Sequence, residues 1–357
     1  MPGIEIRNAS GCQVYDIRQQ QEDSIDLQAK IRAGLSLTPI SLPSLLLWDE
    51  EGLRRFDKFA GSGLYYLRDK ELEILQKRVL EIAAVIPTGS VLVELGCGSL
   101  QKTGLLLQAL ENQQKAVRYY ALDVSLRGLT DSLSELSKEL GDLRSVDITG
   151  LWGTYDDCVT WISTQLDLEP LNTVTFFWMG NSIGNMDHHS EASALLAQFK
   201  DACQASSLRC QFLVAADACE DIHMIQKAYD TSNSTLHAFI LNGLIHANAV
   251  LGREAFSLED WSCESEFCPD ESQLEVYYTP RRDVQVDVGD GCIYHIKRGQ
   301  RIRAISSGKW GKSLMVQVGS MAGLRVNYAW GDCSGLYYFY HLKAGAEESG
   351  RSWAGAD

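Results

Sequence analysis

The residues best suited to chemistry lie in the stretch VELGCGSLQKTGLLLQAL, which covers residues 93–110. An apolar run precedes the glycines and an amphipathic run follows them, which is typical of a buried parallel strand that turns tightly into a helix. Gly96 and Gly98 would let the backbone approach a ligand there, because glycine has no Cβ atom. The spacing departs from the dinucleotide fingerprint G-x-G-x-x-G/A, since Gln101 occupies the last position.

Asp123, at the end of the next predicted strand, YYALDVS, is the second group of this candidate site. A carboxylate at that place can accept hydrogen bonds from both hydroxyls of a ribose. An acidic-x-G-x-G turn with a strand-end Asp, and without a pyrophosphate signature, indicates S-adenosylmethionine and a methyltransferase. Two alternatives stay open. One is a nicotinamide oxidoreductase, which Gln101 disfavours; the other is a turn without a cofactor role in another α/β fold.

The elements around these residues alternate between strand and helix. Helices are predicted at 100–112, 127–140, 155–166 and 189–206, and strands lie between them as far as QFLVAAD. This alternation predicts an α/β, doubly wound, Rossmann-like core over residues 70–217 and 308–345, with ligands beyond the carboxyl ends of the strands. After residue 217 the pattern changes to helices and short alternating strands. Residues 15–69 and 218–307 are therefore expected to form a second, mixed α+β substrate-binding lobe.

Composition narrows the class of protein. The 357 residues carry a net charge of −15, which disfavours nucleic acid and anionic membranes as partners. The first residues contain no apolar h-region, and no run of eighteen apolar residues occurs, so a cytoplasmic protein is expected. The ten cysteines form no C-x-x-C pair and no zinc spacing, so no metal site is predicted.

From about residue 25 to its end, the chain resembles the ergothioneine-pathway histidine Nα-methyltransferases and their fungal relatives, including the dimethylallyltryptophan N-methyltransferases. The matching motifs are LPSLLLWDEEGLRRFDKF, YYLRDKELEIL, VELGCGSLQKTGLLL, YYALDVS, GTYDD, GNSIGNM, KAYD and LNGLIHANAVLGREAF. YYALDVS and GTYDD favour the fungal branch, and with it fungal secondary metabolism. The resemblance implies a class I methyltransferase core, S-adenosylmethionine as cofactor, and N-methylation of the α-amino group of a free amino acid.

The resemblance also implies roles for residues in the matched motifs. The resemblance implies cofactor-binding roles for Gly96, Lys102, Asp123, Thr154 and Tyr155. Gly98, the second glycine of the turn, is included with them. The implied substrate-binding residues are Trp48, Tyr65, Asn185, Tyr229 and Asn248, of which Tyr65 and Asn185 are expected to be catalytic. Trp48 replaces a tyrosine common in the family, and its indole N–H remains a hydrogen-bond donor. His188 and His189 are expected at the surface of a helix start and are not predicted to be catalytic.

The substrate prediction depends on a departure from the histidine-specific pattern. Those enzymes hold the imidazole with an acidic residue and, two positions later, a small polar one; here RAISSGKW places Ile305 and Ser307 there. Val276 takes the place of a methionine beside the imidazole. A pocket that loses its charged partner and gains apolar surface favours an indole, so tryptophan or a derivative such as dimethylallyltryptophan is the predicted substrate. The alternatives are L-histidine Nα-methylation and a non-catalytic binding relative.

Overall fold

A computed structural model describes residues 4–7, 13–19, 26–164 and 172–345. The chain forms two compact units. Unit 1 comprises Met1–Gln19, Asp69–Ala218 and Trp310–Asp357, and unit 2 comprises Gln20–Arg68 and Cys219–Lys309. Residues 15 and 16, which were expected in the lobe, lie in a strand of unit 1. Each unit is described by itself.

Unit 1 is built on a nine-stranded sheet, in which a central parallel set carries antiparallel strands at both ends. In spatial order the strands are β1 (Ile4–Arg7), β2 (Gln13–Asp16), β5 (Val146–Trp152), β4 (Val117–Asp123), β3 (Ser90–Leu95), β6 (Thr173–Trp178), β7 (Arg209–Asp217), β14 (Tyr337–Ala344) and β13 (Leu324–Gly331). Every residue of β3 and β6 is buried, as expected for parallel strands covered on both faces. The strand order reverses between β3 and β6. The predicted doubly wound α/β fold is confirmed.

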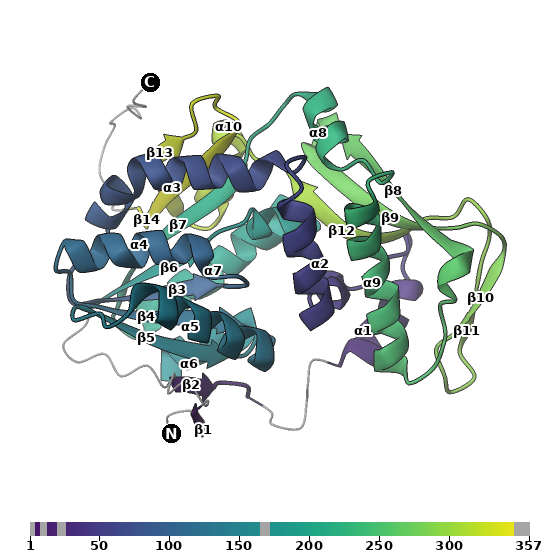
Figure 1. Cartoon of the computed structure of the whole chain (residues 1–357), viewed down its shortest axis with the longest axis horizontal. Helices are drawn as coiled ribbons and strands as arrows, with labels where there is room; N and C mark the ends of the chain where they lie inside the picture. Colours follow the sequence, from purple (N-terminus) through teal and green to yellow (C-terminus); the bar gives the residue numbers. More distant parts are fainter. Residues whose placement is uncertain (1–3, 8–12, 20–25, 165–171, 346–357) are drawn as a thin grey trace. The chain divides into compact units, whose positions relative to one another are not determined.

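Helices cover both faces of this sheet (Figure 1). One layer holds α3 (Tyr66–Ala84), α4 (Gln101–Asn112) and α5 (Leu126–Leu140). In the other layer α7 (His189–Ala205) packs against both α6 (Tyr155–Thr164) and α10 (Lys312–Met321). His188 is the N-cap of α7, and its ring accepts the Ser190 N–H, so the expectation of a helix-start histidine is confirmed.

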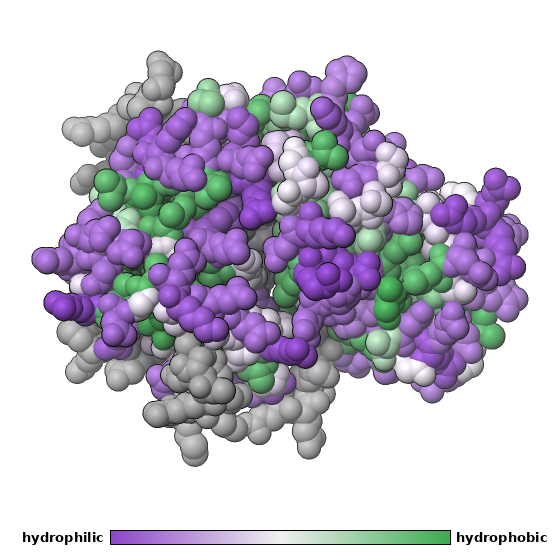
Figure 2. Space-filling model, viewed as in Figure 1, coloured by the Kyte–Doolittle hydropathy of each residue, from purple (hydrophilic) through white to green (hydrophobic). Residues whose placement is uncertain are grey.

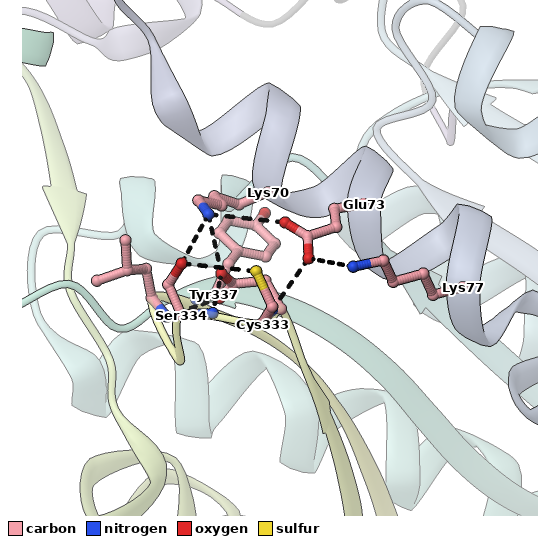
Figure 3. A network of polar contacts seen from close by, with 8 residues as sticks. Lys70, Glu73, Lys77, Cys333, Ser334 and Tyr337 are labelled. Carbon is pink, nitrogen blue, oxygen red and sulfur yellow. Dashed lines mark hydrogen bonds and ion pairs between the residues drawn. The ribbon is translucent and has the colours of Figure 1, made fainter.

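An ion-pair network fastens α3 to the turn between β13 and β14 (Figure 3). The Lys70 ammonium lies 3.1 Å from the Asp332 carboxylate and donates to Ser334 Oγ at 2.9 Å. Glu73 accepts the Cys333 N–H at 3.1 Å and pairs with Lys77 at 2.8 Å. Because lysines already neutralise both carboxylates, we assign this cluster an anchoring role.

Unit 2 combines helices with short antiparallel strands. Its helical elements are α1 (Leu27–Leu35), η1 (Ser44–Leu47), α2 (Glu50–Ala60), α8 (Ile222–Ala228), α9 (Ser234–Leu251), η3 (Leu258–Asp260) and η4 (Pro269–Glu271). A three-stranded sheet has the order β12 (Ile302–Gly308), β9 (Gln273–Pro280), β8 (Trp261–Cys268), and β10 (Val284–Asp287) pairs with β11 (Ile293–Ile296). A Cβ atom on Gly243 of α9 would lie 2.2 Å from Tyr278 Oη of β9, so glycine permits this close packing. The expected separate α+β lobe is confirmed as a fold.

The helix α2 carries charged side chains on its exposed face and aromatic side chains on its buried face. Its outward residues Glu50, Arg54 and Lys58 are exposed, and Figure 2 shows a strongly hydrophilic surface over this helix. Phe59 on the same helix is 1% exposed. The helix therefore presents its aromatic side chains to the interior of unit 2.

Candidate active site

The glycine turn of unit 1 follows β3 directly. Gly96 has a φ of 70° and Gly98 a φ of 48°, a left-handed conformation that favours glycine. A Cβ atom on Gly96 would lie 3.0 Å from Tyr155 Oη. Without a Cβ atom at these positions, a cofactor could approach the backbone of the turn closely.

Asp123 ends the neighbouring strand β4, and the structure brings it to the glycine turn. One carboxylate oxygen accepts the Gly98 N–H at 3.1 Å and the other accepts the Ser125 N–H at 3.0 Å. Burial raises the pKa of Asp123, although these backbone donors act in the opposite direction. The result is a fixed, half-buried acceptor, which suits the hydroxyls of the cofactor's ribose.

Thr154 and Tyr155 follow β5, the next strand along this edge. Thr154 Oγ1 donates to Asp157 Oδ2 at 2.7 Å, and the Asp157 N–H donates back to Thr154 Oγ1 at 3.1 Å, so the threonine caps α6. The Tyr155 ring packs edge-on against Trp178, with centroids 5.4 Å apart. Burial raises the pKa of the Tyr155 hydroxyl well above its usual range, so it stays neutral.

Asn185 closes the short helix η2 (Ser182–Asn185), which follows β6. This loop begins with two left-handed residues, Gly180 and Asn181. The Asn181 side chain accepts the Asp217 N–H at 2.9 Å and so ties the loop to β7. The carboxyl ends of β5, β4, β3 and β6 are adjacent in the sheet, and they bring together the predicted residues of unit 1.

Lys102 lies at the start of α4, and its ammonium forms an ion pair with Glu71 of α3. Glu71 is 1% exposed, and the sequence prediction did not name it. It belongs to the motif YYLRDKELEIL, but no spacing there indicates that this one of several acidic residues is buried.

A cluster of aromatic rings surrounds Tyr65 in unit 2. Tyr65 is 7% exposed, and its ring centroid lies 4.9 Å from that of Phe59 and 5.7 Å from that of Tyr229. Trp48 lies 5.2 Å from Phe56, which in turn contacts Tyr65 at 5.8 Å. The aromatic cluster, as we call it below, consists of Trp48, Phe56, Phe59, Tyr65, Tyr229 and Phe239. It joins three predicted substrate-binding residues through continuous ring contacts.

Tyr229 connects this cluster to the strand β12. Its hydroxyl lies 2.8 Å from Ser307 Oγ, so two predicted residues share a hydrogen bond. The ammonium of Lys309, a residue only 3% exposed, donates to Ser307 Oγ at 2.9 Å and lies 4.7 Å from the Tyr229 ring centroid. The prediction missed Lys309, because a lysine is normally expected at the surface.

Ile305 and Val276 are direct partners across β12 and β9, so they share one face of the small sheet. The pairing is irregular between Arg303 and Ile305, where an extra residue forms a bulge. Ser307 lies two residues further along and faces the same side as Ile305. Three residues that were aligned to the side-chain pocket therefore lie on one surface.

Asn248 has a different environment from the other predicted residues. Its side chain donates to Phe256 O at 2.7 Å and accepts the Phe256 N–H at 2.9 Å. The side-chain nitrogen and oxygen of Asn248 therefore both bind the backbone of the loop after α9. The site that we propose does not include Asn248.

Comparison with known proteins identifies the family of the chain. Residues 27–344 match the family described as "Histidine-specific methyltransferase, SAM-dependent". The chain is 63% identical over 349 residues to the N-methyltransferase benX of Aspergillus terreus, covering 97% of this chain and 96% of that protein. It is 31% identical over 348 residues to the 4-dimethylallyltryptophan N-methyltransferase easF of Epichloe festucae var. lolii, covering 92% of this chain and 98% of that protein.

Among solved structures, the magnesium protoporphyrin IX methyltransferase of Synechocystis PCC 6803 matches with a TM-score of 0.41 and 12% identity, over 83% of this chain and 94% of that one. Among the helices that the structure describes, none has the length and apolar character needed to cross a membrane. The chain belongs to the SAM-dependent histidine-specific methyltransferase family, and it is an S-adenosylmethionine-dependent N-methyltransferase of fungal secondary metabolism.

Proposed function

We propose that the enzyme methylates the α-amino nitrogen of a free aromatic amino acid, with tryptophan or a derivative such as dimethylallyltryptophan as the preferred substrate. The observation that carries this proposal is the arrangement of aromatic and aliphatic side chains in unit 2. There the aromatic cluster meets Ser307 through Tyr229, and Ile305 pairs with Val276.

The energetics favour an aromatic side chain on such a surface. An aromatic side chain that buries ~200 Å² of apolar area gains about 5 kcal/mol at 25 cal/mol per Å². Imidazole offers less apolar area, and Ile305 cannot replace the hydrogen bond that an acidic residue would supply. The easF relative is a 4-dimethylallyltryptophan N-methyltransferase, and this likeness supports the same substrate class.

The residues of unit 1 are proposed to hold the cofactor. Gly96 and Gly98 would form the turn that receives the cofactor, and Asp123 would accept the ribose hydroxyls. Thr154 and Tyr155 would lie beside the adenine, and Lys102 would complete the set. When bound, S-adenosylmethionine supplies an electrophilic methyl group. Transfer forms a nitrogen–carbon bond as the sulfur–carbon bond breaks, so this chain has to present a neutral amine nitrogen in line with the methyl group.

Alignment is the main contribution expected from the protein, since well-oriented reactants can save about 7–11 kcal/mol of the barrier. Asn185 is proposed to orient the amino acid through its carboxylate or its amine, since an amide both donates and accepts. Tyr65 is proposed to stabilise the growing positive charge on the nitrogen with its ring face.

The second candidate is L-histidine, which the description of the matching family favours. Ser307, the small polar residue aligned to the imidazole partner, is present and holds a hydrogen bond to Tyr229. In that case Ile305 would lie outside the recognition surface. Membership in this methyltransferase family argues against the alternative of a non-catalytic binding relative. The cytoplasmic location and the absence of nucleic-acid and membrane partners stay predictions.

The test is kcat/KM for tryptophan, dimethylallyltryptophan, tyrosine and histidine, measured side by side with the same enzyme preparation. We expect one of the two indole substrates to lead. A tenfold or larger advantage for histidine would overturn the proposal. A reaction without amino acid controls for spontaneous breakdown of the cofactor.

A further inference from the structure

Glu71 is a buried carboxylate that accepts hydrogen bonds from several segments of unit 1. One oxygen accepts the Gly180 N–H at 2.7 Å and the Tyr337 hydroxyl at 3.1 Å. The other oxygen accepts the Lys102 ammonium. A side chain that is only 1% exposed thus receives three donors from three separate segments of unit 1.

Two of these donors come from segments with proposed roles in methyl transfer. Lys102 opens the helix that follows the glycine turn, and it is proposed to hold the cofactor. Gly180 opens the loop that carries Asn185, and its φ of 71° places it in the left-handed region. Glu71 therefore connects the cofactor turn to the loop that is proposed to orient the substrate.

The Lys102 side chain keeps 23% of its surface exposed, whereas the Glu71 side chain keeps only 1%. An ammonium has three donors, so the bond to Glu71 leaves others available for a ligand. A free lysine side chain would lose much of its rotamer entropy when it is fixed by a ligand. The ion pair with Glu71 removes much of that cost beforehand, because it already restricts the ammonium.

We propose that Glu71 is a positioning residue for methyl transfer, acting on Lys102 and on the Gly180 backbone. It orients the lysine ammonium toward the cofactor and fixes the start of the Asn185 loop. The inference rests on the proposed function, in which Lys102 holds the cofactor and Asn185 orients the amino acid.

Glu73 provides a matched control on the same helix. It lies two residues further along α3 and also accepts donors in an ion-pair network, but its partners are Lys70, Lys77 and the β13–β14 turn (Figure 3). A purely structural role of Glu71 would therefore resemble that of Glu73. Glu71 differs from Glu73 because it accepts donors from Lys102 and Gly180.

The experiment compares Glu71→Gln with Glu73→Gln in the full chain, by calorimetric titration with S-adenosylmethionine alone. We expect Glu71→Gln to raise the Kd about tenfold or more, as for loss of a charge-assisted contact. Glu73→Gln should stay within about twofold of the wild type, a difference of less than 0.5 kcal/mol. The Lys102→Met variant should weaken binding similarly, and Glu71→Gln added to it should cause little further loss. Additive losses, or wild-type affinity of Glu71→Gln, would overturn the inference.

Two further measurements keep the result interpretable. If Glu71→Gln does not fold, Glu71→Asp keeps the charge but shortens its reach, and it should also raise the cofactor Kd. Wild-type affinity of Glu71→Asp would then contradict the inference. Because cofactor binding is measured without an amino acid, a failure of the tryptophan proposal leaves this test unaffected.

Discussion

The two units build their proposed ligand-binding residues from different kinds of groups. At the carboxyl edge of unit 1, backbone conformation and charge dominate: left-handed glycines, an aspartate that accepts main-chain N–H groups, and the Glu71–Lys102 pair. In unit 2 the corresponding surface consists of aromatic rings and aliphatic cross-strand partners around Tyr229. Main-chain groups suit a cofactor whose polar atoms do not vary. Side chains on a strand can be exchanged without altering the fold, so substrate choice is expected to depend on unit 2.

The largest effect is expected from Asp123→Ala, which removes the charged acceptor of unit 1. Each lost charged hydrogen bond is worth roughly 1.5–3 kcal/mol, so two bonds correspond to at least a hundredfold weaker cofactor binding. Calorimetric titration measures it, with Asp147→Ala on the exposed side of β5 as the control. Unchanged affinity would mean that the end of β4 does not hold the ribose.

Asn185→Ala should separate catalysis from cofactor binding. We expect kcat to fall about a hundredfold, as for a lost orienting contact, while the cofactor Kd changes little. The exposed Asn112→Ala serves as the control. Equal losses in kcat and in cofactor affinity would instead assign Asn185 a structural role.

Ile305→Glu tests whether unit 2 determines the substrate. Restoring an acidic group opposite Val276 should raise the histidine-to-tryptophan ratio of kcat/KM at least tenfold, because a hydrogen-bonding partner for imidazole returns. The same substitution at Ile293, which is 50% exposed on β11, should leave the ratio unchanged. If both variants behave alike, Ile305 lies outside the recognition surface.

Glu94→Gln tests the protonation of a buried glutamate of unit 1 by its effect on the pH dependence of unfolding. Burial raises the pKa of Glu94 from 4.5 to about 8, so the folded protein keeps a proton that the unfolded chain has lost. The stabilisation by protonated Glu94 is fully present below pH 4.5 and is lost progressively as the pH rises from 4.5 through about 8. Glutamine imitates the protonated form, so thermal unfolding of the variant between pH 5 and 8 should show a weaker pH dependence. An unaltered profile would contradict this assignment.

The smallest effect on turnover is expected from Asn248→Ala. The variant loses two hydrogen bonds to Phe256, which corresponds to about 1–3 kcal/mol of folding stability. Steady-state kinetics should give an unchanged KM for the amino acid. A tenfold rise in that KM at unchanged melting temperature would return Asn248 to the substrate surface.

The central strands could be predicted because burial on both faces leaves runs that are mostly apolar, as in Thr173–Trp178. The strand β2 was missed, since its four residues contain one fully buried side chain, Val14, and no clear alternation. Motif matching proposed Gly96, Asp123 and Asn185, which the sheet brings to one edge. It could not show that Lys309 is buried, because nothing local distinguishes a buried lysine from an exposed one.

The bulge in β12 links the length of this strand to the register of the proposed substrate-binding residues. An extra residue between Arg303 and Ile305 sets which side chains meet Val276. Deleting that residue would restore regular alternation and exchange the two faces of the strand before it. If Ile305 contacts the substrate as proposed, a change of one residue in the length of this strand would alter the recognition residues without any change in side-chain chemistry.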